Sequence, residues 1–161
     1  MSRISPDRRD LAFRSLDEIL ADAERVLGGP HRTTGSWTAP QIVWHVADLI
    51  AVANGHMDLS LPLPLKAFGR TLKLLRLFDR PIPSGIRMPK AAAANVAEAA
   101  DREPADSLAH LRREVEHANR HPMTHPSPLF GRLTPHQWLR VNCRHADLHF
   151  SFMHPIDAAR P

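Results

Sequence analysis

The chain has 161 residues, of which 43% are hydrophobic and 24% are charged. This length suits one globular domain with a sizeable core and is too short for two full ones, so we expect a single domain over residues 1–161. The longest apolar stretches are broken by proline or charge well before the roughly 18 residues that a membrane span needs. These features exclude a membrane-spanning protein and favour a soluble one.

Cysteine is scarce, while histidine and proline are abundant. The single cysteine, Cys143, excludes an intrachain disulfide and a cysteine-based zinc ribbon, and residues 1–6 lack the apolar core of a signal peptide. We therefore expect a reducing, cytoplasmic setting. The chain also has 11 His, 15 Pro and no Tyr. A metal site would accordingly use nitrogen and oxygen ligands, and histidine is the first residue type to examine.

The positive charge is modest and dispersed. The formal net charge is +4, and basic residues occur in scattered pairs such as Arg8-Arg9 and Arg112-Arg113. A looser helical set comprises Arg70, Lys73, Arg76 and Arg80. No block of five or more basic residues is interleaved with aromatic ones, so the pattern favours a solvated or anion-attracting face over a nucleic-acid-binding surface.

Capping chemistry predicts the first two helices. In a capping box, a Ser or Thr oxygen accepts a free backbone N–H, and a Glu or Gln three residues later accepts one in return. Ser15 to Glu18 fits this pattern and opens a helix over about 16–28, which the sequence Gly28-Gly29-Pro30 ends. Thr38 to Gln41 opens the second helix, which weakens near Asn54-Gly55.

Helical spacing of apolar residues predicts the later elements. The spacing predicts a basic amphipathic helix over 66–78 and another helix over 105–119. Thr134 to Gln137 is a third capping box, and its helix extends to about His154, before Pro155. No segment shows convincing strand alternation, and residues 59–65 contain two prolines, so we expect an extended loop or lid there. The prolines concentrate in the connections, which predicts an all-α fold, an antiparallel helix bundle with long, proline-stiffened loops.

Histidine pairs spaced by four residues place both imidazoles on one helix face, within reach of one cation. With 11 His in 161 positions, chance gives about 0.7 such pairs at any chosen spacing. The chain has three pairs: His117/His121, His121/His125 and His145/His149. Proline follows both His121 and His125 and disfavours the helical conformation there, so only the third pair is expected in an uninterrupted helix.

His145 and His149 lie on the seam predicted to face the core. This seam comprises Trp138, Asn142, His145, His149 and Phe152. Buried imidazoles need hydrogen-bond partners or a cation, because an unmet polar group costs about 1–3 kcal/mol. His45 is embedded in the apolar part of the second helix and is the candidate third ligand. Alone, His45 would fit a core histidine bonded to a carbonyl or water; beside the buried pair, the metal interpretation is favoured.

Three segments together resemble the DinB/YfiT-like superfamily of metalloenzymes, in particular one of its branches of unknown function. They are Trp37 to Asp48, Phe130 to Trp138 and Arg144 to His149, and the resemblance covers about residues 10–154. It implies a four-helix bundle in which His45, His145 and His149 bind a divalent metal ion such as Zn, Ni or Fe, with open positions for water. It also implies thiol dependence, since related members transfer low-molecular-weight thiols to electrophiles.

Other residues are candidates for supporting roles. Asp48, three residues after His45, would orient a ligand imidazole or a bound water, or else be an ordinary solvated residue. His125, in a loop before the last helix, would serve as a substrate or proton-transfer group, or else be solvated. Cys143 is expected to be a buried, inert thiol. The three tryptophans, Trp37, Trp44 and Trp138, fit core packing.

Two classes of function remain open at this point. The first is a metal-dependent thiol S-transferase or a hydrolase-like enzyme acting on a small-molecule substrate, without nucleic-acid or membrane partners. The second is a non-catalytic stress-associated or metal-sensing bundle, dimerised through residues 59–65 or an exposed helix face. A third, less favoured interpretation is a small basic DNA-binding protein, which predicts a strong dependence of DNA affinity on salt.

Overall fold

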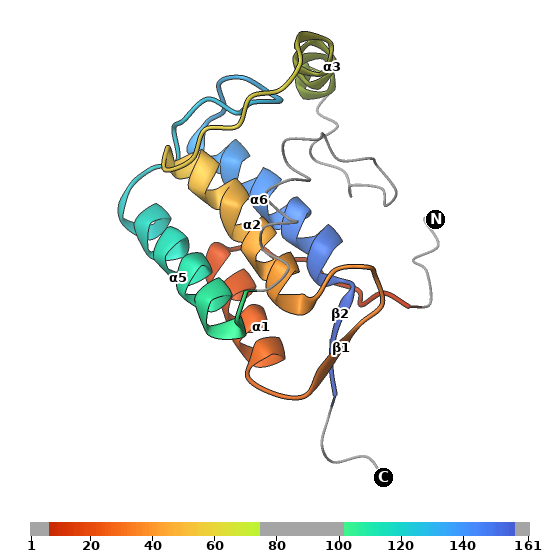
Figure 1. Ribbon diagram of the computed structural model, residues 1–161. Coiled ribbons are helices and arrows are strands. Elements are labelled where there is room, and N and C mark those ends of the chain that lie inside the picture. The colour runs from red at the N-terminus through yellow and green to blue at the C-terminus, as the bar shows by residue number, and fades with distance from the viewer. Residues whose placement is uncertain (1–6, 75–101, 157–161) are drawn as a thin grey trace.

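The structure is a computed structural model that describes residues 7–74 and 102–156, and helices dominate it (Figure 1). Five helices and two short strands occur in these residues. Their bounds are α1 Leu16–Leu27, β1 His31–Thr33, α2 Ala39–Asn54, α3 Leu63–Leu74, α5 Pro104–Arg120, α6 Pro135–Phe150 and β2 Met153–Pro155. The mainly helical class is therefore confirmed. The predicted helices at 16–28 and 105–119 match the observed bounds within a residue or so, and the second helix begins after its predicted cap and ends at Asn54.

Both helices that carry the candidate ligands begin at the predicted capping boxes. At α2, the Thr38 hydroxyl accepts from the Gln41 N–H at 3.3 Å, and the Gln41 side chain accepts from the Thr38 N–H at 2.8 Å. Thr134 and Gln137 repeat this exchange at α6, at 3.2 and 3.0 Å. These reciprocal bonds satisfy backbone donors that a helix start leaves free, and they fix the residue at which each helix begins.

The remaining predicted box, at α1, is only half formed. The Ser15 hydroxyl accepts from the Glu18 N–H at 3.2 Å, as expected. The Glu18 carboxylate, however, accepts from the backbone N–H of Arg14 at 2.7 Å and not from that of Ser15. The helix still begins at Leu16, because one side-chain cap is enough to start it.

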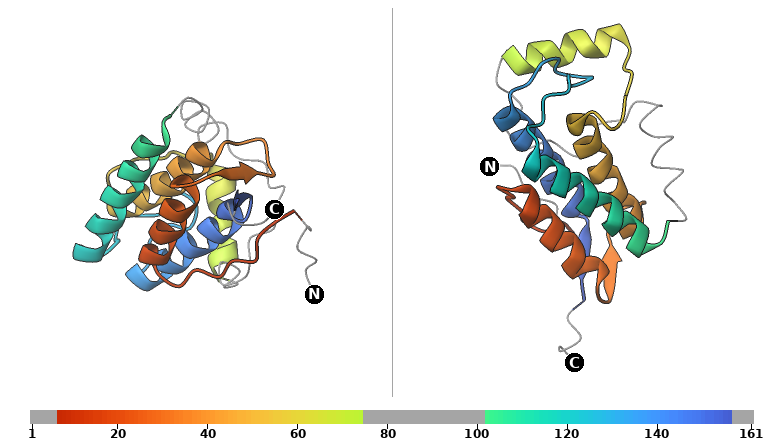
Figure 2. Two further views of the ribbon diagram at one scale, coloured as in Figure 1. Left: turned by 90° about the horizontal axis from the view of Figure 1, so that it is seen from below. Right: turned by 90° about the vertical axis from the view of Figure 1, so that its left-hand side faces the viewer.

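Four helices, α1, α2, α5 and α6, pack around a common core. Helix α2 contacts the other three, and α6 runs beside it in the opposite direction (Figure 1). Helix α3 lies across one end of this group (Figure 2). The largest fully buried apolar side chains are Ile19, Val26, Ile42, Val43, Val46, Ile50, Leu111, Val115, Trp138, Phe150 and Met153. None of the described helices is long and apolar enough to cross a membrane.

The absence of strands was a wrong prediction. Strands β1 and β2 pair antiparallel, with Arg32 opposite His154. The last helix consequently ends at Phe150, four residues before the predicted end, and the chain turns directly into β2. Strands of three residues are too short to show alternation. Their pairing joins segments more than 100 positions apart, and local sequence patterns do not reveal such a pairing. The sheet ties the start of α2 to the end of α6.

The connection to α3 is shorter than expected. Residues 63–65 of the predicted loop at 59–65 belong to the first turn of α3, where Pro64 is tolerated because helix-start N–H groups lack partners. The end of the predicted helix, Phe78, lies outside the described residues, as do Arg76 and Arg80. Helix α3 packs closely on the loop before α6, since a Cβ on Gly69 would collide with the backbone of Leu129.

A buried ion pair joins the N-terminal segment to α1. Asp22, 9% exposed, accepts two hydrogen bonds from Arg9, at 2.9 and 2.6 Å, and a third from Arg25 at 2.6 Å. Burial alone would raise the pKa of Asp22, but the bonds and charges of the two arginines outweigh it, so this pKa is lowered from its ordinary value. Arg9 also donates to the Phe150 carbonyl at 3.1 Å, which links α1 to the end of α6.

Replacing Asp22 should destabilise the fold. The substitution Asp22→Asn leaves Arg9 part-buried without its counter-charge, which costs about 3 kcal/mol in the free energy of unfolding, measured by urea denaturation. Because the folded-state pKa of Asp22 is lowered, its stabilisation is present above about pH 4 and is lost as the pH falls below that. Asp22→Asn should therefore lose less stability than the wild type as the pH falls below about 4. The control Asp106→Asn, at an exposed carboxylate, should lose as much as the wild type. Equal stability of wild type and Asp22→Asn at pH 7 would contradict this role.

Candidate metal centre

The three predicted ligands come together between α2 and α6. His45 lies in the middle of α2, and His145 and His149 are one turn apart on the facing side of α6. One ring nitrogen from each lies within 4.8 Å of the other two. Among the described residues, this trio is the only group of three or more His, Cys, Asp or Glu side chains gathered this closely. Residues 100 positions apart in the sequence thus form one cluster of nitrogen donors.

The spacing of the rings suits a shared ion. The Nε2 atoms of His45 and His145 lie 3.0 Å apart, and the ring centroids are separated by 4.7, 4.7 and 4.5 Å. Two imidazole nitrogens that each lie about 2.0–2.1 Å from one ion are themselves about 2.8–3.4 Å apart at right-angled to tetrahedral geometry. The observed separation of His45 and His145 therefore falls within the range that a transition-metal site requires.

The environment keeps all three imidazoles neutral. Burial lowers the pKa of His45 to about 4, although the charge of Asp48 acts in the opposite direction. Burial, together with the charges of His45 and Arg8, lowers the pKa of His149 to about 3. The pKa of His145 is also lowered well below its usual range, first by burial and then by the two neighbouring imidazoles. At neutral pH each ring thus carries a lone pair that can bind a cation.

Hydrogen bonding within the trio is incomplete. Nδ1 of His145 is buried and has no hydrogen-bond partner among the described residues. Its other nitrogen faces Nε2 of His45, and only one of these two atoms can carry the shared proton. An unmet buried nitrogen costs about 1–3 kcal/mol. With a cation in place of the shared proton, both Nε2 atoms would offer a lone pair to it, so the donor set fits a metal ion.

Trp37 forms a wall of the cluster, a role the sequence did not indicate. Its ring stacks on His149, with centroids 5.4 Å apart and planes 7° apart, and meets His45 edge-on at 5.3 Å. Trp37 directly precedes the α2 cap at Thr38, and β1 pairs with β2 just before it in the chain. The short sheet thereby helps to place this ring over His149. Core packing was the role predicted for Trp37, and nothing in the local sequence distinguishes it from a core tryptophan.

Asp48 and His125 are not members of the close group formed by the trio. Asp48 accepts from Nε2 of His110 at 3.0 Å and so orients an α5 imidazole instead of a candidate ligand. The backbone N–H of His125 donates to Ala53 at the end of α2, and its ring lies against Gly55. Ala53 follows His45 by eight residues, about 12 Å along a helix. The structure thus does not bring His125 to the trio.

Cys143 has the environment expected of an inert thiol. It is buried and free, and burial, with the nearby charges of Asp147 and Glu18, raises its pKa to about 11. The reactive form of cysteine is the thiolate, which is scarce at neutral pH when the pKa is this high. Cys143 therefore supplies neither a metal ligand nor a nucleophile.

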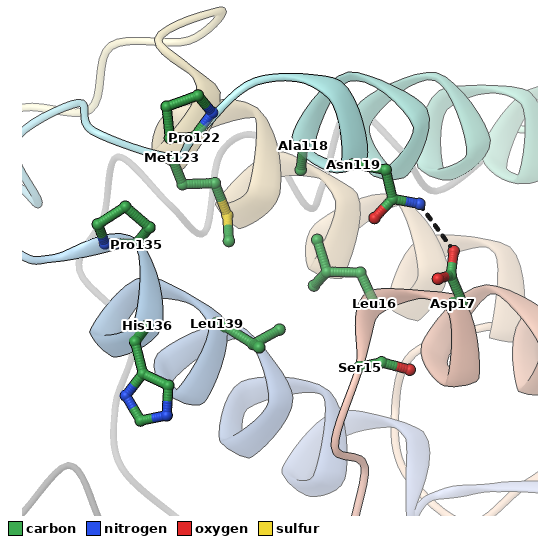
Figure 3. A pocket seen from close by; sticks show the side chains of 10 residues that line it. All are labelled: Ser15, Leu16, Asp17, Ala118, Asn119, Pro122, Met123, Pro135, His136 and Leu139. Atoms are coloured by element: carbon green, nitrogen blue, oxygen red, sulfur yellow. Dashed lines mark hydrogen bonds between the residues drawn. The ribbon is translucent and has the colours of Figure 1, made fainter.

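A shallow groove lies elsewhere, between the starts of α1 and α6 and the end of α5 (Figure 3). Its volume is about 310 Å³, and it is lined mainly by apolar side chains, including Leu16, Met123 and Leu139. Asn119 donates to Asp17 at its rim at 2.9 Å. The groove residue His136 is 13 positions before His149, about 20 Å along a helix, so the groove and the trio are separate features.

The neutral state of the trio can be tested by NMR. In the presence of a chelator, the imidazole signals of His45 and His149 should remain those of neutral rings until the pH falls to about 4 and about 3. An unfolded chain binds these protons below about pH 6.5, so the metal-free protein should lose stability as the pH falls from 6.5 toward 4. Midpoints near 6.5 for His45 and His149 would contradict the burial described here.

Comparison with known proteins places the chain in a family without assigning an activity. The model of a family described as "Protein of unknown function (DUF1569)" matches residues 5–156. No curated protein and no solved structure matches the chain. Because the family match spans nearly the whole sequence and includes all three histidines of the trio, the chain belongs to the DUF1569 family.

Proposed function

We propose that this protein is a DinB-like four-helix-bundle metalloenzyme that holds one divalent transition-metal ion through His45, His145 and His149. The observation that carries the proposal is the convergence of three neutral ring nitrogens within 4.8 Å of one another. The packing of α1, α2, α5 and α6 around one core and the resemblance of the sequence motifs to DinB-like proteins support the fold assignment.

The donor set favours a transition metal over magnesium or calcium. Magnesium and calcium prefer oxygen ligands, whereas neutral imidazoles suit zinc, nickel and iron. The trio has no carboxylate within its group in the described part of the chain. Asp48, the acidic residue nearest to His45 along α2, is bonded to His110 instead. We therefore propose Zn, Ni or Fe as the resident ion.

The number of protein ligands favours catalysis over a purely structural role. Structural zinc sites have four protein ligands, whereas catalytic sites usually have three and leave a position for water or substrate. The described residues provide three close ligands. When bound in such a site, a divalent metal lowers the pKa of a coordinated water or thiol and so supplies a nucleophile at neutral pH.

The surrounding residues define what this chain itself contributes. The three imidazoles are half-buried and therefore accessible from one side, while Trp37 covers His149 with its ring. Cys143 is buried with a raised pKa, so a thiol used in the reaction would come from solution. Together with the family resemblance, this supports a small-molecule substrate and a low-molecular-weight thiol as co-substrate. We place thiol transfer ahead of hydrolysis on that resemblance.

Metal content tests the proposed site directly. Protein loaded with Zn or Ni and then dialysed should retain about one ion per chain, while His45→Ala, His145→Ala and His149→Ala should each lose it. The control His136→Ala removes an exposed histidine outside the trio and should retain the ion. Bound Ni should also quench tryptophan fluorescence, less so in Trp37→Phe, because Trp37 stacks on His149.

Failure of the wild type to hold near-stoichiometric metal after exposure to both ions would contradict the site. If the site holds metal, the loaded enzyme should be screened with low-molecular-weight thiols and electrophiles. Turnover that requires His145 would support the enzymatic proposal. A metal site without any turnover would favour the alternative, a non-catalytic metal-sensing or stress-associated bundle.

A further inference from the structure

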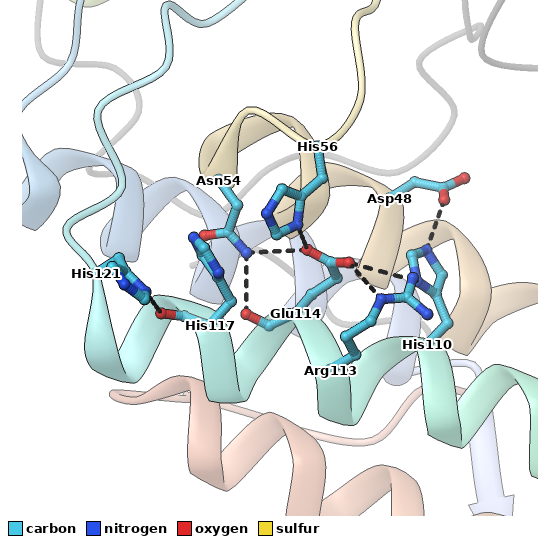
Figure 4. A network of polar contacts seen from close by, with 8 residues as sticks. All are labelled: Asp48, Asn54, His56, His110, Arg113, Glu114, His117 and His121. Atoms are coloured by element: carbon cyan, nitrogen blue, oxygen red, sulfur yellow. Dashed lines mark hydrogen bonds and ion pairs between the residues drawn. The ribbon is translucent and has the colours of Figure 1, made fainter.

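A second group of histidines meets on the other side of α2, against α5 (Figure 4). His56 follows the end of α2, and His117 and His121 lie at the end of α5. The ring centroids of His56 and His117 are 4.3 Å apart, and those of His117 and His121 are 4.4 Å apart and nearly parallel. Three imidazoles from two helix ends therefore form a continuous row.

Helix α5 ends before Pro122 as expected, yet His117 and His121 remain in contact. Helix α5 ends at Arg120, and His121 is extended, with φ −133° and ψ 138°, as expected for a residue before Pro122. The predicted consequence, that His117 and His121 do not share one uninterrupted helix, is therefore confirmed. Their rings nevertheless stack, because the side chain of His121 turns back along the last turn of the helix, where its Nδ1 lies 3.3 Å from the His117 carbonyl.

Glu114 sets the proton position on His56. Glu114 is 1% exposed, and Nδ1 of His56 lies 2.7 Å from its carboxylate. Burial would raise the pKa of Glu114, but hydrogen bonds from Asn54, His56 and Arg113 lower it below the ordinary value. A carboxylate can only accept, so Nδ1 of His56 donates, and the lone pair of the neutral ring lies on Nε2. In metal sites, a carboxylate commonly holds a ligand histidine in this way.

His121 is held in a similar way by the backbone. A carbonyl oxygen also accepts only, so Nδ1 of His121 donates to the His117 carbonyl and leaves the lone pair on Nε2. No hydrogen bond to Nε2 of either His56 or His121 occurs within the described residues. Backbone carbonyls are the other common partner of metal-ligating histidines. Two of the three rings thus present a free Nε2.

The group is accessible to ions from solution. The side chain of His56 is 40% exposed, His117 is half-buried and His121 is exposed. Desolvation, followed by the charges of His56 and His121, lowers the pKa of His117 from its ordinary value. In its neutral form the middle ring offers a lone pair to a cation.

We propose that His117 and His121 chelate a second divalent transition-metal ion at the surface, with His56 as a third ligand. Unlike the trio at His45, these three residues do not gather their ligand atoms within 4.8 Å of one another. Binding therefore requires side-chain rotation, so this site is weaker than the first and exchanges its ion with solution. The proposal is independent of catalysis at the first site.

The test is a titration with Zn at pH 7.5 against a competing chromophoric chelator. Wild-type protein should bind two ions, one tightly and one weakly. The double variant His117→Ala/His121→Ala should lose the weak step and keep the tight one. The double variant His145→Ala/His149→Ala should lose the tight step and keep the weak one. His136→Ala is the matched control and should keep both.

Two additional measurements make the result specific. His56→Ala should weaken the second step without removing it, because two chelating rings remain. Substoichiometric Cu²⁺ should broaden the NMR signals of His117 and His121 in the His145→Ala/His149→Ala variant, whose first site is removed. The proposal is overturned if the His117→Ala/His121→Ala variant binds as many ions as the wild type with unchanged affinities, or if the wild type shows no weak step.

Discussion

The contact between α2 and α6 places three neutral imidazoles against one another, and the surrounding structure holds this contact in position. Nε2 of His45 and Nε2 of His145 are 3.0 Å apart, although only one proton can lie between them. One of these two nitrogens can donate to the other, but Nδ1 of His145 is left without a partner among the described residues. Capping boxes fix where both helices begin, and the β1–β2 pairing ties their adjoining ends. The arrangement is compatible with a bound cation, which is the basis of the proposed metal centre.

The sequence predicted the helices and the meeting of His45 with the α6 histidine pair, but neither the two strands nor the other contacts between distant segments. The Thr38 and Thr134 caps were readable because each depends on residues three positions apart. The seam with His145 and His149 followed from helical periodicity. The β1–β2 pairing, in contrast, joins residues more than 100 positions apart through strands of only three residues. Asp48 is a similar case. Its position on the helix was evident from the sequence, but its hydrogen bond to the distant residue His110 on α5 was not.

The two histidine clusters show how environment differentiates one residue type. The trio at His45 is formed by helix faces, its rings are shielded enough to have strongly lowered pKa values, and its nitrogens already converge. The row at His117 is formed by helix ends, is open to solvent, and has its protons positioned by Glu114 and a backbone carbonyl. The first arrangement suits a retained ion, and the second suits an exchanging one. The number of histidines in the sequence does not by itself distinguish these two arrangements.

The most direct test of the central claim is zinc K-edge X-ray absorption of the His117→Ala/His121→Ala variant loaded with one equivalent of zinc. The fine structure should show multiple scattering from three imidazoles, with zinc–nitrogen distances of about 2.0–2.1 Å, and a remaining position filled by a light atom. Removing His145 should abolish this signature. A spectrum with fewer than three imidazoles, or one unchanged by His145→Ala, would contradict a metal centre at His45, His145 and His149.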